Sequence, residues 1–445
     1  MPETAAGSKA DEKMSQEEMD GIAKSEGFTP EDVRHNMRAL IFFDSAWQVN
    51  LTDVGFVMQP LLIFLGASNA LLGYAAGPYL TALLPLILSP FITRRFRFKK
   101  YYLFTVVTIY LVPLLLNGLG VLLNRKFAIS RPHLLIWVMG MWVAQQFFNA
   151  LVALPSQEFI SACIPTTHRG RLFGWSLSIG GIGGMGITAL GGWMLLRYPK
   201  PEVFGALLIM AWMIGQAAYV VTLAARERPT PIEKSPPPWS LTMFKAAWSD
   251  KPFLRGLGLY AMMVLFISPT AVFMNAYGLK GLKMVAAYSA LFMMLNQAAR
   301  AIASAPSGHI ADKFSPRMVF PYSFSAVAFG LLPAIILQNK TGVIISVAIL
   351  AIAGSFSWPA WTTLLYSLPK PENRAGHFSV QLLLAATLIP LGNVMAGHLC
   401  DIMPYRTVFI IYSILALAVA GISVRLLGGG SGAPNQGRHE ASEHR

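Results

Sequence analysis

Long apolar runs, each about as long as a membrane-spanning helix, recur along the chain from Ala39 to Leu426. A helix needs about 20 mostly apolar residues to cross a bilayer. Many of the runs contain Gly and Pro, which membrane helices tolerate. The pattern predicts twelve transmembrane helices, at about residues 39–63, 70–91, 101–123, 133–157, 172–196, 203–224, 253–277, 284–307, 318–337, 342–367, 376–399 and 406–426.

Polar segments divide this series of helices. Thr29 and Pro30 have the chemistry of an N-cap and a first helical residue, which predicts a helix that enters the membrane from the surface. The longest connection is rich in proline and is predicted to hold a short amphipathic helix after Ser240. The predicted organisation is an N-terminal tail (1–36), a six-helix bundle (37–224), a linker (225–252), a second six-helix bundle (253–426) and a disordered tail (427–445).

The two sets of six helices share a pattern. Pro155 and Pro165 precede one arginine-containing loop, and Pro359 and Pro369 precede another, each pair offset by 204 residues. A preserved order over so long an offset indicates a duplicated six-helix unit, with the two bundles related by a pseudo-two-fold axis. Chance similarity among helices of biased composition is the alternative.

The charged residues add a prediction of how the helices are oriented in the membrane. Only 13% of the residues are charged, although the net charge is +14; a soluble protein carries about 25% charged residues. The predicted loops on the side of the termini hold 17 Lys and Arg, against 9 on the other side. The positive-inside rule therefore places both termini in the cytoplasm, in a plasma or inner membrane, and the positive charge needs no nucleic-acid partner.

Ionisable side chains inside predicted spans are the strongest functional signal, because a charge at the bilayer centre costs about 3 kcal/mol or more. Asp53 lies near the middle of the first span, Asp44 nearer its cytoplasmic end, and Arg300 well inside the eighth. An Asp53–Arg300 or Asp44–Arg300 pair would join the two bundles. Arg300 would then bind an anionic substrate group or release Asp53 to take up a proton; a structural ion pair is the alternative.

Amide, hydroxyl and aromatic side chains recur on single faces of several spans, which predicts a polar and aromatic cavity between the bundles. Taken singly, each side chain could equally form a hydrogen bond between helices. Together with the ionisable residues, these side chains form the predicted substrate and proton site, which comprises Asp53, Arg300, Asn50, Asp44, Gln48, Gln145, Gln146, Asn149, Tyr260, Asn275, Asn296, Trp358, Trp361 and Gln381.

The sequence between spans eight and nine, GHIADKFSPR, contains Gly308, Asp312, Lys313 and Arg317. It resembles the G-x-x-x-D-[RK] loop signature of the major facilitator superfamily of transporters. The arrangement of six plus six helices over about residues 36–426 also resembles that superfamily. The resemblance implies two six-helix bundles that rock about a central site, so that access alternates between the two membrane faces. The chain departs from the family's proton antiporters in span four, where WVAQQFFNAL contains no arginine.

The resemblance also implies a cytoplasmic gate. In SPFITRRFRFKKYY, between spans two and three, Arg94 stands where the family signature has an aspartate, so an Arg94–Glu372 pair is expected as a charge-inverted latch. The remaining basic residues of this loop could bind anionic lipid instead. The expected gate comprises Arg94, Glu372, Gly308, Asp312, Lys313, Arg317, Arg169 and Arg171.

These observations predict a monomeric secondary transporter that moves a small organic molecule, with protons as an optional coupling ion and membrane lipid as its surroundings. A proton-driven exporter of amphipathic drugs or lipids, and a non-transporting receptor or scaffold, are the alternatives. The absence of a P-loop argues against a primary pump. No enzyme is predicted, because the chain holds no local catalytic motif, although a membrane-embedded enzyme is a further alternative. Cys163 and Cys400 have no metal-ligand or redox spacing, so no metal and no cofactor are expected.

Overall fold

The backbone of this computed structural model is helical over almost all of its described length, which confirms the all-α prediction. The structure describes residues 24, 26–77, 79–82, 85, 88–89, 92–93, 95–229, 247–314, 316–367 and 374–428. Within these ranges the side chains of 79–80, 153–154, 166, 170, 303–314, 316–318, 357–367, 374–376, 378–379 and 427–428 are not described.

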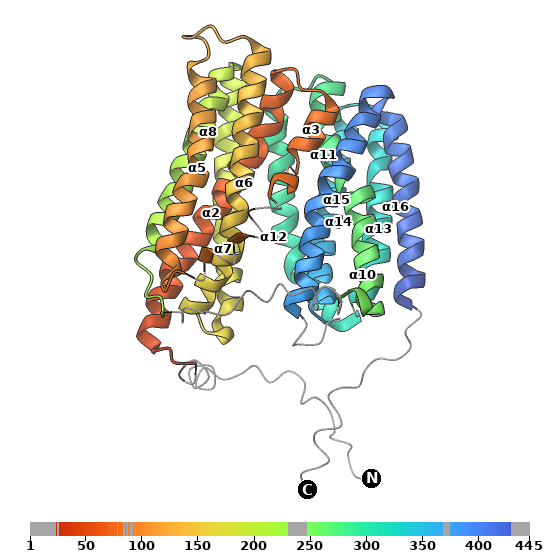
Figure 1. Ribbon diagram of the computed structural model, residues 1–445. Helices are drawn as coiled ribbons and strands as arrows, with labels where there is room; N and C mark the ends of the chain where they lie inside the picture. The colour runs from red at the N-terminus through yellow and green to blue at the C-terminus, as the bar shows by residue number, and fades with distance from the viewer. Residues whose placement is uncertain are drawn as a thin grey trace, which may run out of the picture.

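In Figure 1 the long helices of the first half of the chain lie together on the left, and most helices of the second half lie on the right. The first half comprises α2 (Pro30–Phe64), α3 (Asn69–Ala75), the short 3-10 helix η1 (Tyr79–Ala82), α5 (Lys99–Leu123), α6 (Arg131–Cys163), α7 (Thr166–Arg197) and α8 (Pro201–Thr222). The second half comprises α10 (Lys251–Met262), η2 (Met263–Ile267), α11 (Ser268–Ala276), η3 (Tyr277–Gly281), α12 (Tyr288–Phe314), α13 (Pro316–Leu337), α14 (Lys340–Ser367), α15 (Arg374–Ile402) and α16 (Tyr405–Gly428).

Two helix pairs make the most extensive contacts between the halves. The short helix α3 packs against α15, and α7 packs against α12. Within the first half, α2 packs on α7 and α8, and α5 packs on α6 and α8. Helix α2 therefore has protein on several sides, which explains why its polar residues follow no single division into an apolar and a polar face.

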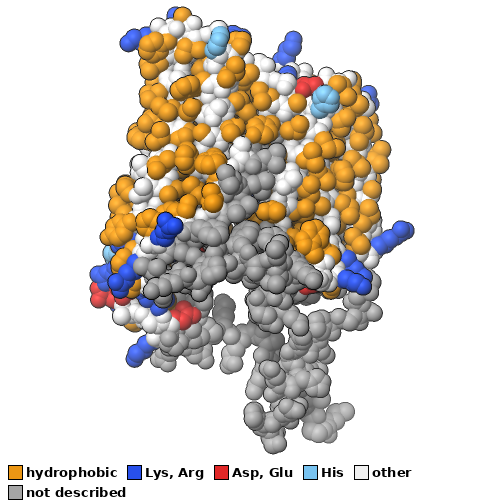
Figure 2. Space-filling model, in the orientation of Figure 1, with side chains coloured by type: hydrophobic (Ala, Val, Ile, Leu, Met, Phe, Trp, Pro, Cys, Tyr) orange, Lys and Arg blue, Asp and Glu red, His pale blue; other side chains and the backbone are white. Residues whose placement is uncertain are grey.

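The outer surface of the helices is apolar. Figure 2 shows hydrophobic side chains over most of the visible face, with Lys and Arg side chains mainly near its upper and lower ends. Large aliphatic residues on several helices are strongly exposed, including Ile136, Ile302, Ile336 and Ile414. Eight of the described helices are long and apolar enough to cross a membrane. Lipid is the solvent that such a surface requires.

The predicted start of the first helix is confirmed. The Thr29 hydroxyl accepts a hydrogen bond from the Asp32 amide at 3.1 Å, Pro30 is the first helical residue, and α2 then runs without a break to Phe64. The Asp32 carboxylate also meets the Arg226 guanidinium at 3.0 Å, just beyond the end of α8. The hydrogen bond from Thr29 and the charge of Arg226 hold the pKa of Asp32 below its usual value.

A small effect of pH on stability follows from this contact. A lowered pKa means that ionised Asp32 stabilises the fold above the unfolded pKa of 3.8, and that this stabilisation is lost as the pH falls through the lower folded value. Asp32→Asn is expected to lower the melting temperature by about 1–2 °C at pH 7, because the ion pair is exposed. In thermal melts the difference from wild type should shrink as the pH falls below 3.8; a difference that grows in acid would contradict this.

The basic loop before α5 is partly folded into the protein. Lys99 is buried, with its ammonium group 3.3 Å from Glu158 and bonded to the Thr93 carbonyl. The Lys100 ammonium donates to the Ala225 carbonyl at 3.0 Å. The Glu227 carboxylate accepts from the backbone amides of both lysines and so caps α5. The ammonium groups of both lysines thus contact the protein, whereas Arg95 and Arg97 are exposed.

The seventh predicted span is less regular than its apolar pattern suggested. Two π-helical turns, η2 and η3, flank the nine-residue helix α11. Pro269 has no N–H to donate, so the carbonyl of Leu265 loses its usual helical partner. The backbone of Gly392 on α15 packs against this site, and a Cβ there would lie 2.9 Å from the Leu265 Cα. π turns inside helices often mark functional sites.

Candidate functional site

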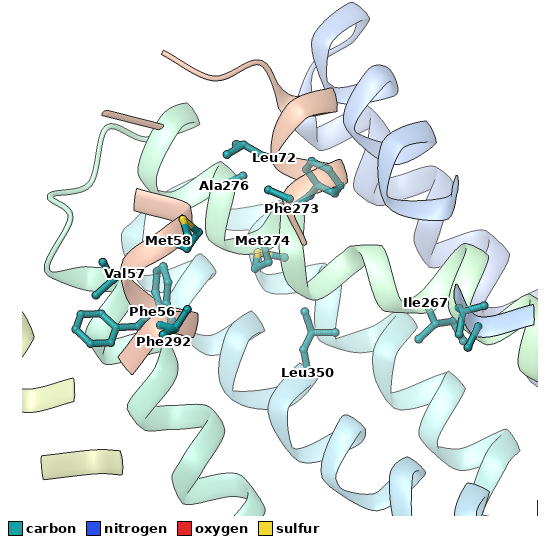
Figure 3. Packing of buried hydrophobic residues seen from close by; sticks show 14 of the residues in the cluster. Phe56, Val57, Met58, Leu72, Ile267, Phe273, Met274, Ala276, Phe292 and Leu350 are labelled. Carbon is teal, nitrogen blue, oxygen red and sulfur yellow. The ribbon is translucent and has the colours of Figure 1, made fainter. Parts of the chain in front are cut away.

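A cavity of about 300 Å³, which we call the central cavity, lies between the two halves of the chain. Its walls come from α2, α3 and α6 of the first half and from α11, α12 and α14 of the second. Figure 3 shows apolar residues of four of these helices side by side, among them Met58, Leu72, Met274 and Leu350, all of which line the cavity. Its volume is at the lower end of the range for small-molecule sites.

Three amide side chains and an indole supply the polar part of this wall. Gln59 of α2 donates from its amide nitrogen to the Val272 carbonyl of α11 at 2.9 Å, and so joins the two halves. Asn296 donates to the Phe292 carbonyl of its own helix at 2.9 Å. Asn275 also lines the cavity, and Trp142 bonds through its indole nitrogen to the Ala75 carbonyl.

A second cavity of about 200 Å³, the side cavity, adjoins the first and shares Trp142 with it. It lies within the first half of the chain, between α2, α5 and α6. The residues predicted from the polar face of span four come together here, since Gln145, Gln146 and Asn149 all line this space. Asn50 of α2 faces them, and its amide nitrogen is bonded to the Ala211 carbonyl of α8.

Asp53 is fully buried in α2, and within the described chain neither of its carboxylate oxygens has a hydrogen-bond partner. The expected Asp53–Arg300 pair is therefore absent from this conformation. Arg300 is exposed on α12, one turn beyond Gln297, whose amide bonds to the Thr52 hydroxyl at 2.5 Å. Neither Asp53 nor Arg300 is among the residues that line the two cavities.

The other polar residues predicted in α2 lie on its contact with α7. Asp44 accepts a hydrogen bond from the Ser176 hydroxyl at 2.6 Å. Gln48 packs against Gly180, where a Cβ would lie 2.7 Å from the Gln48 Cβ. These contacts account for both residues as part of helix packing.

The remaining predicted residues are placed outside the cavities or lie outside the described residues. Tyr260 is buried in α10 and Gln381 half-buried in α15, and neither lines a cavity. Trp358 and Trp361 are helical in α14, but their side chains are not described. Arg169 donates from Nε to the Ile164 carbonyl at 3.3 Å, and Arg171 is exposed. Of the other gate residues, Arg94 and Glu372 lie outside the described residues, as do the side chains of Asp312, Lys313 and Arg317; Gly308 is helical in α12.

A polar contact that the sequence did not predict joins the halves at the top of Figure 1, where α3 begins. The Asp401 carboxylate of α15 accepts hydrogen bonds from the backbone amides of Asn69 and Ala70, both at 3.0 Å. The Asn69 side chain donates to the Cys400 carbonyl at 3.1 Å and accepts from the Tyr405 hydroxyl at 2.6 Å. We call this set of bonds the α3–α15 contact.

Glycines bring the two backbones of this contact close together. A Cβ added at Gly73 would clash with the carbonyl of Asn393, and one at Gly397 would clash with the carbonyl of Asn69. Each helix thus presents an asparagine and a glycine four residues apart to the other. Lys280 of η3 closes the contact from the side, with its ammonium group 3.1 Å from the Ala67 carbonyl.

Comparison with known proteins places this architecture. Residues 287–443 match the family model of the Major Facilitator Superfamily. No curated protein matches the chain at a significant level. Among solved structures, a point mutant of the nucleoside transporter NupG is similar, with a TM-score of 0.63 and 13% identity over 88% of this chain and 99% of that one.

Two further structures show the same likeness. A bacterial homologue of the human lysosomal transporter Spinster, inward-facing and unoccupied, has a TM-score of 0.64 and 17% identity over 90% of this chain and 98% of that one. A D-xylose–proton symporter has a TM-score of 0.63 and 14% identity over 88% of this chain and 97% of that one. The resemblance to the major facilitator superfamily, predicted from the loop signature, is borne out by the family model over residues 287–443, and the solved structures share the fold.

Proposed function

We propose that this protein is a secondary transporter that moves a small organic molecule across the membrane by alternating access. The central cavity supports the proposal most directly, because it lies between the two halves of the chain and is lined by both. The solved structures of similar fold are transporters of nucleosides, of D-xylose with protons, and of peptides. A site enclosed between two halves is the arrangement that alternating access requires.

The full architecture in this proposal has twelve transmembrane helices in two six-helix bundles, with both termini in the cytoplasm. The α3–α15 contact then lies on the external side. Helices from different halves are bonded there through Asp401, Asn69 and Tyr405. The conformation described is therefore one with the external side closed, and transport requires this contact to break.

Asp53 is the proposed proton carrier. Burying an ionised carboxylate without a partner costs several kcal/mol, so the protonated acid is the less costly state in this conformation. The opposite conformation would have to supply Asp53 with water or a cation before it could release the proton. Arg300 is the basic residue that we propose for this second state, since Gln297, one turn away on α12, already contacts the residue next to Asp53.

Uptake into proteoliposomes tests the function. Purified protein would be reconstituted and given radiolabelled uridine or D-xylose, with and without an imposed pH gradient. Uptake above that of protein-free liposomes is expected for at least one probe, and stimulation by the gradient would show proton coupling. Absence of uptake for both probes, together with absence of export of an amphipathic dye, would favour a receptor or scaffold.

A further inference from the structure

The amide groups of the central cavity have a fixed orientation. Gln59 and Asn296 each donate from the amide nitrogen to a backbone carbonyl, at 2.9 Å in both cases. Because a carbonyl oxygen only accepts hydrogen bonds, the nitrogen of each amide must face the protein. The amide oxygens turn the other way, and neither has a hydrogen-bond partner among the described residues. Neither of these two oxygens is a fully buried atom without a partner, in contrast to the amide oxygens of Asn50 and Gln145.

The two available oxygens come from different halves of the chain. Gln59 lies on α2 of the first half and Asn296 on α12 of the second, and both line the same cavity of about 300 Å³. A molecule that donates to both oxygens would therefore join the two halves. Since Gln59 also holds α11 through Val272, its position in the cavity is set by protein contacts and needs little ordering when a ligand binds.

Charged side chains are missing from the described walls. Among the described residues that line the central and side cavities there is no Asp, Glu, Lys, Arg or His. The sequence of 78–91 and of 357–367, which belongs to predicted spans two and ten, also contains none of these residues. An ion that entered such a site would lose its hydration without gaining a counter-charge, at a cost of several kcal/mol.

We propose that the central cavity binds a small uncharged molecule with several O–H or N–H donors, and that the amide oxygens of Gln59 and Asn296 accept two of them. The polyhydroxylated sugars and the nucleosides have this chemistry, whereas carboxylates, phosphates and ammonium compounds of the same size do not. The assignment rests on the proposed transport function, because it names the solute class of that same site. It makes Gln59 and Asn296 specificity residues and leaves Asp53 and Arg300 outside the binding surface.

Matched pairs of compounds test the class. The melting temperature of the purified protein would be measured with uridine against uridine monophosphate, and with D-xylose and D-glucose against D-xylonate and D-gluconate. The neutral member of at least one pair is expected to raise the melting temperature in a saturable way, with its charged partner much weaker. If only charged members stabilise the protein, or if no neutral member does, the assignment is wrong.

Variants test the two residues. Gln59→Met and Asn296→Leu keep the volume of the side chain and remove the amide, so each should raise the Kd of the stabilising compound about five- to tenfold. Gln216→Met is the matched control, because the Gln216 amide bonds to the Thr108 hydroxyl and lines neither cavity. Its Kd should equal that of wild type. Unchanged affinity in both cavity variants would overturn the assignment, and the melting temperature without ligand shows whether each variant is folded.

Uptake into proteoliposomes separates this inference from the proposed function. Transport of a charged compound such as D-gluconate, with no neutral compound transported, would preserve the transporter and reject the neutral class. Binding of a neutral compound without flux would preserve the site and reject transport. Flux of the neutral compound that falls with its affinity in Gln59→Met and Asn296→Leu would support both.

Discussion

Asp53→Asn is expected to reduce pH-driven accumulation of the transported solute to the level of protein-free liposomes. The side chain is fully buried, and no described residue bonds its carboxylate, so asparagine mimics the protonated acid in shape and charge. The variant should therefore fold. Exchange of labelled for unlabelled solute across the membrane should continue, since exchange requires no net movement of a proton.

Asp44→Asn is the matched control for this experiment. Asp44 lies on the same helix but is only half-buried and accepts a hydrogen bond from the Ser176 hydroxyl, so its carboxylate has a partner that Asp53 lacks. The Asp44→Asn variant should retain gradient-driven accumulation of the solute. The proton role of Asp53 is rejected if Asp53→Asn still accumulates solute against a gradient, or if both variants lose accumulation and exchange together.

Asp401→Asn is expected to open the protein at the α3–α15 contact, which is the external side in the proposed orientation. The carboxylate accepts from two backbone amides, and an asparagine can accept from only one of them while turning its own N–H groups toward the other. A hydrogen bond to a charged group contributes about 1.5–3 kcal/mol. Losing one should raise the population of the open state about ten- to a hundredfold relative to the closed state.

A native cysteine reports on this change. Cys400 is buried beside Asp401, and its carbonyl accepts from Asn69. In a Cys163→Ser background, a membrane-impermeant methanethiosulfonate reagent added from outside should modify Cys400 faster in Asp401→Asn than in the parent. Asp250→Asn is the control, because Asp250 caps α10 within one half of the chain. Equal modification rates in the parent and in Asp401→Asn would show that the α3–α15 contact is not a gate.

Much of the site could be predicted because polar residues inside apolar spans are costly and therefore informative. Asn275 and Asn296 line the central cavity, and Gln145 and Asn149 line the side cavity, as their positions on single helix faces indicated; Gln146, the neighbouring amide, lines the side cavity too. Gln59 was missed because it stands alone beside Pro60 in an apolar stretch, where periodicity gives no face. A polar residue next to an intrahelical proline was the available signal.

Other features depend on which helix ends meet, and a hydrophobic pattern does not contain that information. Asn69 and Asp401 are 332 residues apart in the sequence, and only the folded structure brings them into contact. The absence of an Asp53–Arg300 pair from this conformation could not be predicted for the same reason, since the sequence gives the cost of each buried charge but not its partner. The π turns were hidden because a span that is apolar on all sides has the same composition in either helical form.

The π turn η2 also determines how the central cavity responds to a change of chain length in related proteins. A π turn accommodates one residue more than an α turn, so a chain with one residue fewer between Met263 and Ile267 would form a regular α-helix there. Because the wider turn absorbs the extra residue, the face bearing Val272 and Asn275 would keep its direction toward Gln59 after such a deletion. In homologues, a single-residue deletion here would therefore leave the cavity face and the solute selectivity largely unchanged, which makes this turn a position where chain length can vary without loss of the site.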